Sequence, residues 1–140
     1  MKKQNYSRKR EAILQTLRAT KTHPTAEWVY QQLKTAFPDL SMGTVYRNLS
    51  LFKQEGTIAS VGIVNGQERF DADVSPHTHF VCLGCGAVQD SGPLPAQEEA
   101  RVAQEYGVTV LTEQVLYYGY CSACEQKRRE AEQLPQKKEA

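Results

Sequence analysis

The chain has 140 residues, of which 40% are hydrophobic and 24% charged, and its formal net charge is +1. This length allows one ordinary domain or two small ones, and the composition is that of a globular protein. No apolar run is long enough to span a bilayer, and Met1 is not followed by the apolar core of a signal peptide. We therefore expect a soluble, cytoplasmic protein.

The charge is unevenly distributed along the chain. Residues 1–56 carry ten Lys/Arg and four Asp/Glu, a balance of +6, whereas residues 57–140 carry seven and twelve, a balance of −5. A basic first half is expected of a segment that contacts phosphates, and an acidic second half of one that collects cations. This asymmetry alone does not indicate a function, because surface charge often varies along a chain without functional meaning.

Residues 1–74 show the pattern of three short helices followed by a β-hairpin. Capping residues and apolar spacing predict a helix capped by Ser7, a second from Thr25 to Phe37, and a third from Ser41 to a glycine cap at Gly56. Two predicted strands, 58–64 and 68–72, flank Asn65-Gly66, the strongest short signal for a hairpin turn. This order of elements is that of a winged helix-turn-helix domain.

The third helix would then be the one that reads DNA. Polar side chains face away from its apolar side: Thr44, Tyr46, Arg47, Ser50 and Lys53. Arginine can bind guanine through two hydrogen bonds in the major groove, while hydroxyls and lysine suit phosphates. The solvent side of any small helical bundle has a similar polar face, so the helix pattern by itself leaves both interpretations open.

Residues 75–140 are predicted to form an α/β unit. The expected elements are strands 78–83 and 87–90, a helix 95–106 closed by Gly107, a long strand 108–120 and a charged helix 122–133. The long apolar strand offers a surface for a homodimer, which is the commonest assembly and suits paired DNA half-sites.

The cysteines form two C-x-x-C pairs: Cys82, Cys85, Cys121 and Cys124. Each pair supplies two sulfurs from one tight turn, and two such turns complete a tetrahedron around zinc with bonds of about 2.3 Å. In a secreted chain the same residues would indicate disulfides, whereas in a cytosolic chain they indicate a structural zinc site. A redox-sensitive pair of disulfides is the alternative.

His77 and His79 form a second candidate metal site. Residues i and i+2 of a strand point to the same face, so both imidazoles can reach one ion, and Asp71 and Asp90 are candidate carboxylates. Nitrogen and oxygen donors suit iron, manganese or zinc. An isolated histidine is more often an ordinary surface group, but two of the three histidines stand in this pair.

Beyond these patterns, the chain from about Tyr6 to Lys127 resembles the ferric uptake regulator (Fur) family of metal-dependent repressors. The motifs that carry the resemblance are His23-Pro-Thr-Ala, Ser41-Met-Gly-Thr-Val-Tyr-Arg-Asn-Leu, Glu68-Arg-Phe-Asp71, His77-Thr-His79-Phe-Val-Cys82-x-x-Cys85-Gly and Tyr118-Gly-Tyr-Cys121-x-x-Cys124. The resemblance implies an α+β fold. An N-terminal winged helix-turn-helix domain (1–74) would precede a C-terminal α/β dimerisation and metal-binding domain (75–140) with a four-cysteine zinc site.

The resemblance also implies a regulatory Fe(II) or Mn(II) site with the ligands His23, Asp71, His77, His79 and Asp90. The aspartate at the last position resembles the peroxide-sensing repressor (PerR) branch, whereas iron sensors of the family tend to carry glutamate there. In that branch Fe(II) and hydrogen peroxide oxidise histidine ligands, here matching His23 and His77. We therefore expect a homodimeric repressor of double-stranded operator DNA that senses hydrogen peroxide.

Three alternatives remain. One is an iron- or manganese-responsive repressor without oxidation, and another is a DNA-binding dimer with zinc alone. The third is a zinc enzyme that uses His77, His79 and an aspartate. No general base is evident beside an open coordination position, as hydrolytic zinc sites need, so we expect no enzyme.

Overall fold

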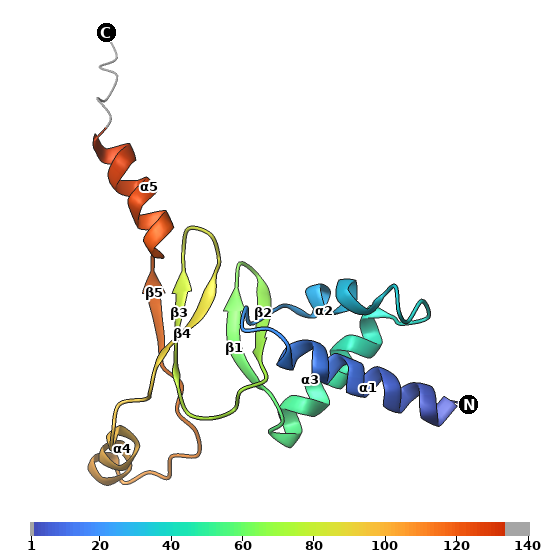
Figure 1. The fold of residues 1–140 in the computed structure, drawn as a ribbon. Coiled ribbons are helices and arrows are strands. Elements are labelled where there is room, and N and C mark those ends of the chain that lie inside the picture. The colour runs from blue at the N-terminus through green and yellow to red at the C-terminus, as the bar shows by residue number, and fades with distance from the viewer. Residues whose placement is uncertain (1, 134–140) are drawn as a thin grey trace. The chain divides into compact units, whose positions relative to one another are not determined.

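The computed structural model describes residues 2–133, with side chains from Tyr6 onward. The chain divides into two compact units, Met1–Ser75 (unit 1) and Pro76–Ala140 (unit 2). Helices precede a small sheet in unit 1, and sheet and helices alternate in unit 2, so the fold is α+β as predicted (Figure 1). Within the described residues, no helix is both long and apolar enough to cross a membrane.

Unit 1 consists of three helices and a two-stranded antiparallel sheet. The elements are α1 (Lys2–Arg18), α2 (Ala26–Leu33), α3 (Met42–Glu55), β1 (Ala59–Val64) and β2 (Gln67–Asp71). Asn65 and Gly66 connect the two strands with φ angles of 52° and 80°, as a type I′ turn requires. The predicted order, three helices and then a hairpin, is confirmed.

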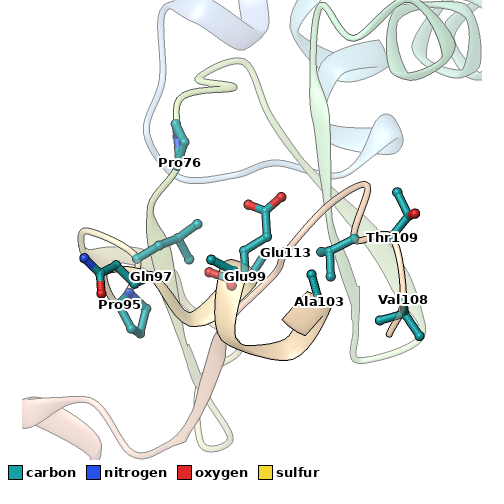
Figure 2. Close-up of a pocket in the computed structure, with 11 residues that line it drawn as sticks. Pro76, Pro95, Gln97, Glu99, Ala103, Val108, Thr109 and Glu113 are labelled. Atoms are coloured by element: carbon teal, nitrogen blue, oxygen red, sulfur yellow. The ribbon is translucent and has the colours of Figure 1, made fainter. Parts of the chain in front are cut away.

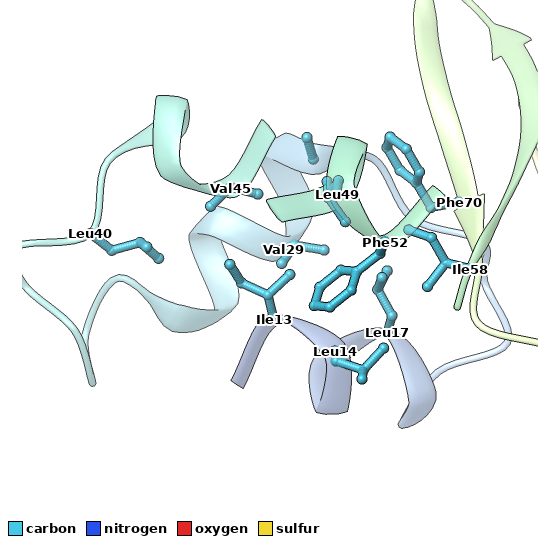
Figure 3. Close-up of a cluster of buried hydrophobic side chains, with 11 residues drawn as sticks. Ile13, Leu14, Leu17, Val29, Leu40, Val45, Leu49, Phe52, Ile58 and Phe70 are labelled. Atoms are coloured by element: carbon cyan, nitrogen blue, oxygen red, sulfur yellow. The ribbon is translucent and has the colours of Figure 1, made fainter. Parts of the chain in front are cut away.

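All three helices and β2 contribute to the core of unit 1 (Figure 3). Its most deeply buried large side chains include Ile13, Leu17, Val29, Leu49, Phe52 and Phe70. The helix α3 has both of its predicted caps. The Ser41 hydroxyl accepts a hydrogen bond from the Thr44 N–H at 3.1 Å, and Gly56 ends the helix with a φ of 75°.

Two predicted helix ends in unit 1 are wrong. Helix α1 begins at Lys2 rather than at a Ser7 cap, because the residues before Ser7 include no glycine or proline that would interrupt a helix. Helix α2 ends at Leu33, whereas the sequence predicted a helix up to Phe37. The chain passes from α2 to Phe37 through a turn instead of a further helical turn.

Unit 2 contains a three-stranded sheet and two helices. The strands are β3 (Thr78–Cys82), β4 (Val88–Gly92) and β5 (Leu116–Gly119), and the helices are α4 (Glu98–Tyr106) and α5 (Ser122–Gln133). The strand β3 lies between the other two, antiparallel to β4 and parallel to β5. Residues of β3 therefore have neighbours from both other strands.

The strand predicted over residues 108–120 is much shorter in the structure. Among the described residues, only Leu116–Gly119 pairs with β3. The strand β3 has five residues, so it cannot pair along the whole predicted strand. The segment 108–115 is rich in β-branched residues, but such residues favour a strand only where a partner strand is present. The dimer surface expected from the longer strand stays a prediction.

A pocket of about 680 Å³ lies between α4 and the segment that follows it (Figure 2). Its lining is largely apolar, with Leu94, Ala103, Val108 and Val110 beside the carboxylates of Glu99 and Glu113. None of the residues predicted to bind metal or DNA lines this pocket, so it is separate from the candidate site.

Replacing Phe52 with alanine should lower the free energy of unfolding by about 3–5 kcal/mol, because the ring is 1% exposed and leaves a cavity in the core of unit 1. Tyr46→Ala, on the same helix but 54% exposed, should change it by less than about 0.5 kcal/mol. Urea unfolding followed by circular dichroism measures both. Similar losses for the two variants would contradict the observed orientation of α3.

Candidate metal centres

The four cysteines meet in unit 2, where β3 approaches the start of α5. One sulfur from each of Cys82, Cys85, Cys121 and Cys124 lies within 4.8 Å of all the others. The Sγ atoms of Cys85 and Cys121 are 3.9 Å apart. Zinc–sulfur bonds of about 2.3 Å place the sulfurs of a tetrahedral site about 3.8 Å apart, so the cluster fits a four-thiolate zinc ion.

Glycines shape the turn that carries the first two sulfurs. Gly86 has a φ of 75°, and its N–H donates to the Cys82 carbonyl at 3.0 Å. At Gly84 a Cβ atom would come within 2.9 Å of the Cys124 Sγ. The turn can therefore approach the second cysteine pair only with a glycine at position 84.

Backbone amides act on one sulfur in particular. The N–H groups of Cys121 and Cys85 donate to the Cys82 Sγ at 3.3 and 3.4 Å, and they lower the pKa of the Cys82 thiol to about 6. Contacts with the Cys121 and Cys82 sulfurs raise the pKa of Cys124 to about 12. Negative charge is thus favoured on Cys82, and a cation that binds here has to displace the proton of Cys124.

In unit 1, His23 and Asp71 form a buried pair. His23 Nε2 is 3.1 Å from Asp71 Oδ2, and the two side chains are 2% and 10% exposed. His23 lies in the loop between α1 and α2, and Asp71 is the last residue of β2. The other Asp71 oxygen accepts the N–H of Asp73 at 2.8 Å. The structure therefore brings together the two ligands predicted for this half of the chain.

The loop that carries His23 is attached to β2 through its main chain. The Phe70 N–H donates to the Pro24 carbonyl at 3.0 Å, and the Arg69 guanidinium donates to the carbonyls of Thr22, at 2.9 Å, and His23. Sequence reasoning did not single out Arg69. The available signal was its position inside the Glu68-Arg-Phe-Asp71 motif, two residues before a predicted ligand.

In unit 2, His77, His79 and Asp90 converge. The Nε2 atoms of the two histidines are 2.9 Å apart, and Asp90 Oδ1 lies 3.1 Å from His77 Nε2 and 3.4 Å from His79 Nε2. The register of β3 and β4 places His79 opposite Asp90. Neighbouring ligands of one ion with bonds of about 2.1 Å are separated by about 3 Å, so the three donors are spaced for a shared cation.

The polar residues predicted to contact DNA share the helix α3 but differ in their surroundings. Tyr46, Arg47 and Ser50 are exposed. Thr44 is half-buried, with its hydroxyl 2.9 Å from that of Ser41. Lys53 donates to the Glu68 carboxylate on β2 at 2.9 Å, so its charge is partly committed within unit 1.

Known proteins with similar sequences and structures cover most of the chain. The model of the ferric uptake regulator family matches residues 2–118. The peroxide-responsive repressor PerR of Staphylococcus aureus (strain USA300) is 35% identical over 119 residues, which are 84% of this chain and 80% of that protein.

Two solved structures are also similar. The Campylobacter jejuni peroxide stress regulator has a TM-score of 0.74 at 25% identity, over 86% of this chain and 91% of that one. The Pseudomonas aeruginosa ferric uptake regulator, solved with manganese, has a TM-score of 0.63 at 31% identity, over 81% and 87%. On the family match and the similarity to the repressor, the chain belongs to the ferric uptake regulator family and is a metal-responsive repressor rather than an enzyme.

Proposed function

We propose that the chain forms a homodimer, binds double-stranded operator DNA in the cytoplasm and senses hydrogen peroxide through a regulatory metal. The ligands would be His23, Asp71, His77, His79 and Asp90. The observation that carries the proposal is that each unit presents a histidine and an aspartate 3.1 Å apart. Neither set alone fills the coordination shell of Fe(II) or Mn(II), whereas five nitrogen and oxygen donors nearly complete an octahedron.

The four-cysteine cluster would hold a structural zinc ion. Among the described side chains, the buried apolar ones of unit 2 are Val81, Cys82 and Val88, against thirteen in unit 1. A unit with so small a core depends on a further constraint, and binding of zinc to four thiolates contributes directly to folding. The ion would join β3 to α5.

A regulatory ion with ligands from both units would fix one unit relative to the other. In a dimer this would set the spacing between the two α3 helices, which has to match the spacing of the operator half-sites. The ion then acts as a corepressor because its affinity is higher for the form that binds DNA. DNA must raise the affinity for the ion by the same factor.

Two findings support peroxide as the signal. Both carboxylates of the proposed site are aspartates, and a relative that is 35% identical is named a peroxide-responsive repressor. Bound Fe(II) would catalyse the oxidation of a neighbouring imidazole by hydrogen peroxide, with the two electrons that peroxide accepts coming from the ring. The ring of His23 or His77 would gain one oxygen atom while the other leaves as water, and the altered ring would lose its place as a ligand. The link between the units, and with it DNA binding, would then be lost.

A sensor of iron or manganese level that undergoes no oxidation is the second candidate. It is favoured by the similarity to the Pseudomonas aeruginosa ferric uptake regulator with manganese, which is 31% identical. The two candidates share every proposed ligand. They differ only in whether hydrogen peroxide modifies the histidines.

The deciding measurement is operator binding by Fe(II)-loaded and Mn(II)-loaded protein before and after hydrogen peroxide. We expect only the Fe(II) form to lose DNA and to gain 16 Da (about one oxygen atom per modified ring), because Mn(II) does not promote this oxidation. Trypsin separates the candidate sites, since His23 lies in peptide 22–34 and His77 in peptide 70–101. Fragment spectra distinguish His77 from His79 within the second peptide. If the Fe(II) form keeps both its DNA and its unmodified histidines, the metal-level sensor replaces the peroxide sensor.

Replacing Cys121 with serine should abolish zinc binding and unfold unit 2, because three thiolates leave the tetrahedral shell incomplete. Ala123→Ser introduces the same hydroxyl at an exposed position between the two cysteines and should retain one zinc per chain. Metal analysis and circular dichroism measure the two effects. A Cys121→Ser protein with its zinc and its fold retained would contradict the four-thiolate site.

Arg47→Ala should reduce the discrimination between operator and random DNA by about 1–3 kcal/mol, the usual loss for a side chain that reads a base edge. Gln54→Ala, at another exposed position of α3, serves as the control and should leave discrimination unchanged. Fluorescence anisotropy at fixed salt gives both affinities. Equal weakening on the two DNAs would make Arg47 a phosphate contact instead.

A further inference from the structure

Three consecutive residues of β2 hold three consecutive residues of the loop before α2. Arg69 donates to the carbonyls of Thr22 and His23, and Phe70 donates to the carbonyl of Pro24. Asp71 then approaches the imidazole of His23 at 3.1 Å. The segment 22–24 is thus fixed along its main chain by the same strand that carries the carboxylate partner of its side chain.

The backbone of His23 needs such support. Its φ of 54° lies in the left-handed region, which is unfavourable for a residue with a Cβ atom. The hydrogen bonds to the carbonyls of Thr22, His23 and Pro24 oppose relaxation of this conformation. A guanidinium suits two adjacent carbonyls because its donors lie in one plane at fixed angles, whereas the lysine ammonium on its flexible stem has no such fork.

We propose that Arg69 is a positioning residue of the regulatory metal site: it holds the main chain at His23 so that the imidazole points to Asp71. This inference rests on the proposed regulatory function. The role is geometric, because the electrostatic effect of Arg69 has the opposite sign. A positive charge two residues from a ligand repels a divalent cation, so removal of that charge alone would strengthen metal binding.

The opposing signs make the inference testable in the zinc-loaded, full-length protein. Titration with Mn(II), with free Mn(II) followed by its electron paramagnetic resonance, gives the affinity. Arg69→Lys keeps the charge and loses the planar fork, while Arg69→Gln removes both. We expect each to weaken Mn(II) binding about tenfold or more, as the loss of a residue that orients a ligand does. Unchanged binding in Arg69→Lys, or tighter binding in Arg69→Gln, would overturn the inference.

The matched control is Arg10→Lys. Arg10 belongs to the same unit, forms an ion pair with Glu55 at 2.7 Å and lies over the Phe52 ring. Its replacement perturbs packing of unit 1 without touching the loop, and it should leave Mn(II) affinity unchanged. A loss equal to that of Arg69→Lys would mean that any disturbance of unit 1 weakens the site, and it too would overturn the inference.

A double-mutant cycle separates positioning from a general effect on the fold. In a His23→Ala protein the loop has no ligand left to orient, so adding Arg69→Lys should cause no further loss of Mn(II) affinity. The same loss in both backgrounds would contradict a role exerted through His23. Asp71→Asn and His77→Ala test the site itself. If neither weakens Mn(II) binding, the proposed regulatory site is wrong and the role of Arg69 is overturned with it.

Discussion

A zinc ion bound by the four clustered sulfur atoms would connect parts of unit 2 that apolar packing leaves weakly held. One of these sulfur atoms belongs to Cys82 at the end of β3, and His79 stands three residues earlier on the same five-residue strand. Order that zinc imposes on β3 would therefore extend to His79 and, because His79 pairs with Asp90, to β4. The proposed regulatory ligands of unit 2 would depend in this way on the proposed zinc site, although the two sets of ligands suit different metals.

In unit 1, the four residues of the motif Glu68-Arg-Phe-Asp71 contact α3, the core and the loop that carries His23. Consecutive residues of a strand face opposite sides, and the contacts follow that rule. Glu68 pairs with Lys53 of α3, and Phe70 enters the core. Arg69 and Asp71, on the other side, hold the loop and the imidazole of His23. One short strand thus contacts both the helix proposed to read DNA and a proposed metal ligand, which gives these two elements a continuous physical connection.

Local chemistry made much of this fold predictable. The caps at Ser41 and Gly56 and the Asn65-Gly66 turn are set by neighbouring residues, and the cysteine spacing indicates the sulfur cluster without further context. Apart from the helix ends of unit 1, the features that the sequence did not predict depend on residues far away in the chain. Residues 108–115 have the composition of a strand, but in the part of the chain that the structure describes the paired segment is Leu116–Gly119. The polar face of α3 does not reveal that Lys53 pairs with Glu68. The role of Arg69 was not predictable from the sequence. Its hydrogen bonds end on main-chain carbonyls, so they depend on the path of the loop and not on which side chains stand at positions 22 and 23.

The attachment of the loop to β2 affects the structure that unit 1 would have after oxidation of His23. The bonds from Arg69 and Phe70 end on main-chain oxygens, and an imidazole that gains an oxygen atom keeps its main-chain carbonyl. The main chain of an oxidised His23 would therefore keep its hydrogen bonds within a folded unit 1, although the side chain could no longer act as a metal ligand. The oxygen atom added by hydrogen peroxide would stay covalently bound to the ring. Adding metal or removing peroxide would not reverse this modification. Recovery of repression would then follow the pace at which new chains are made.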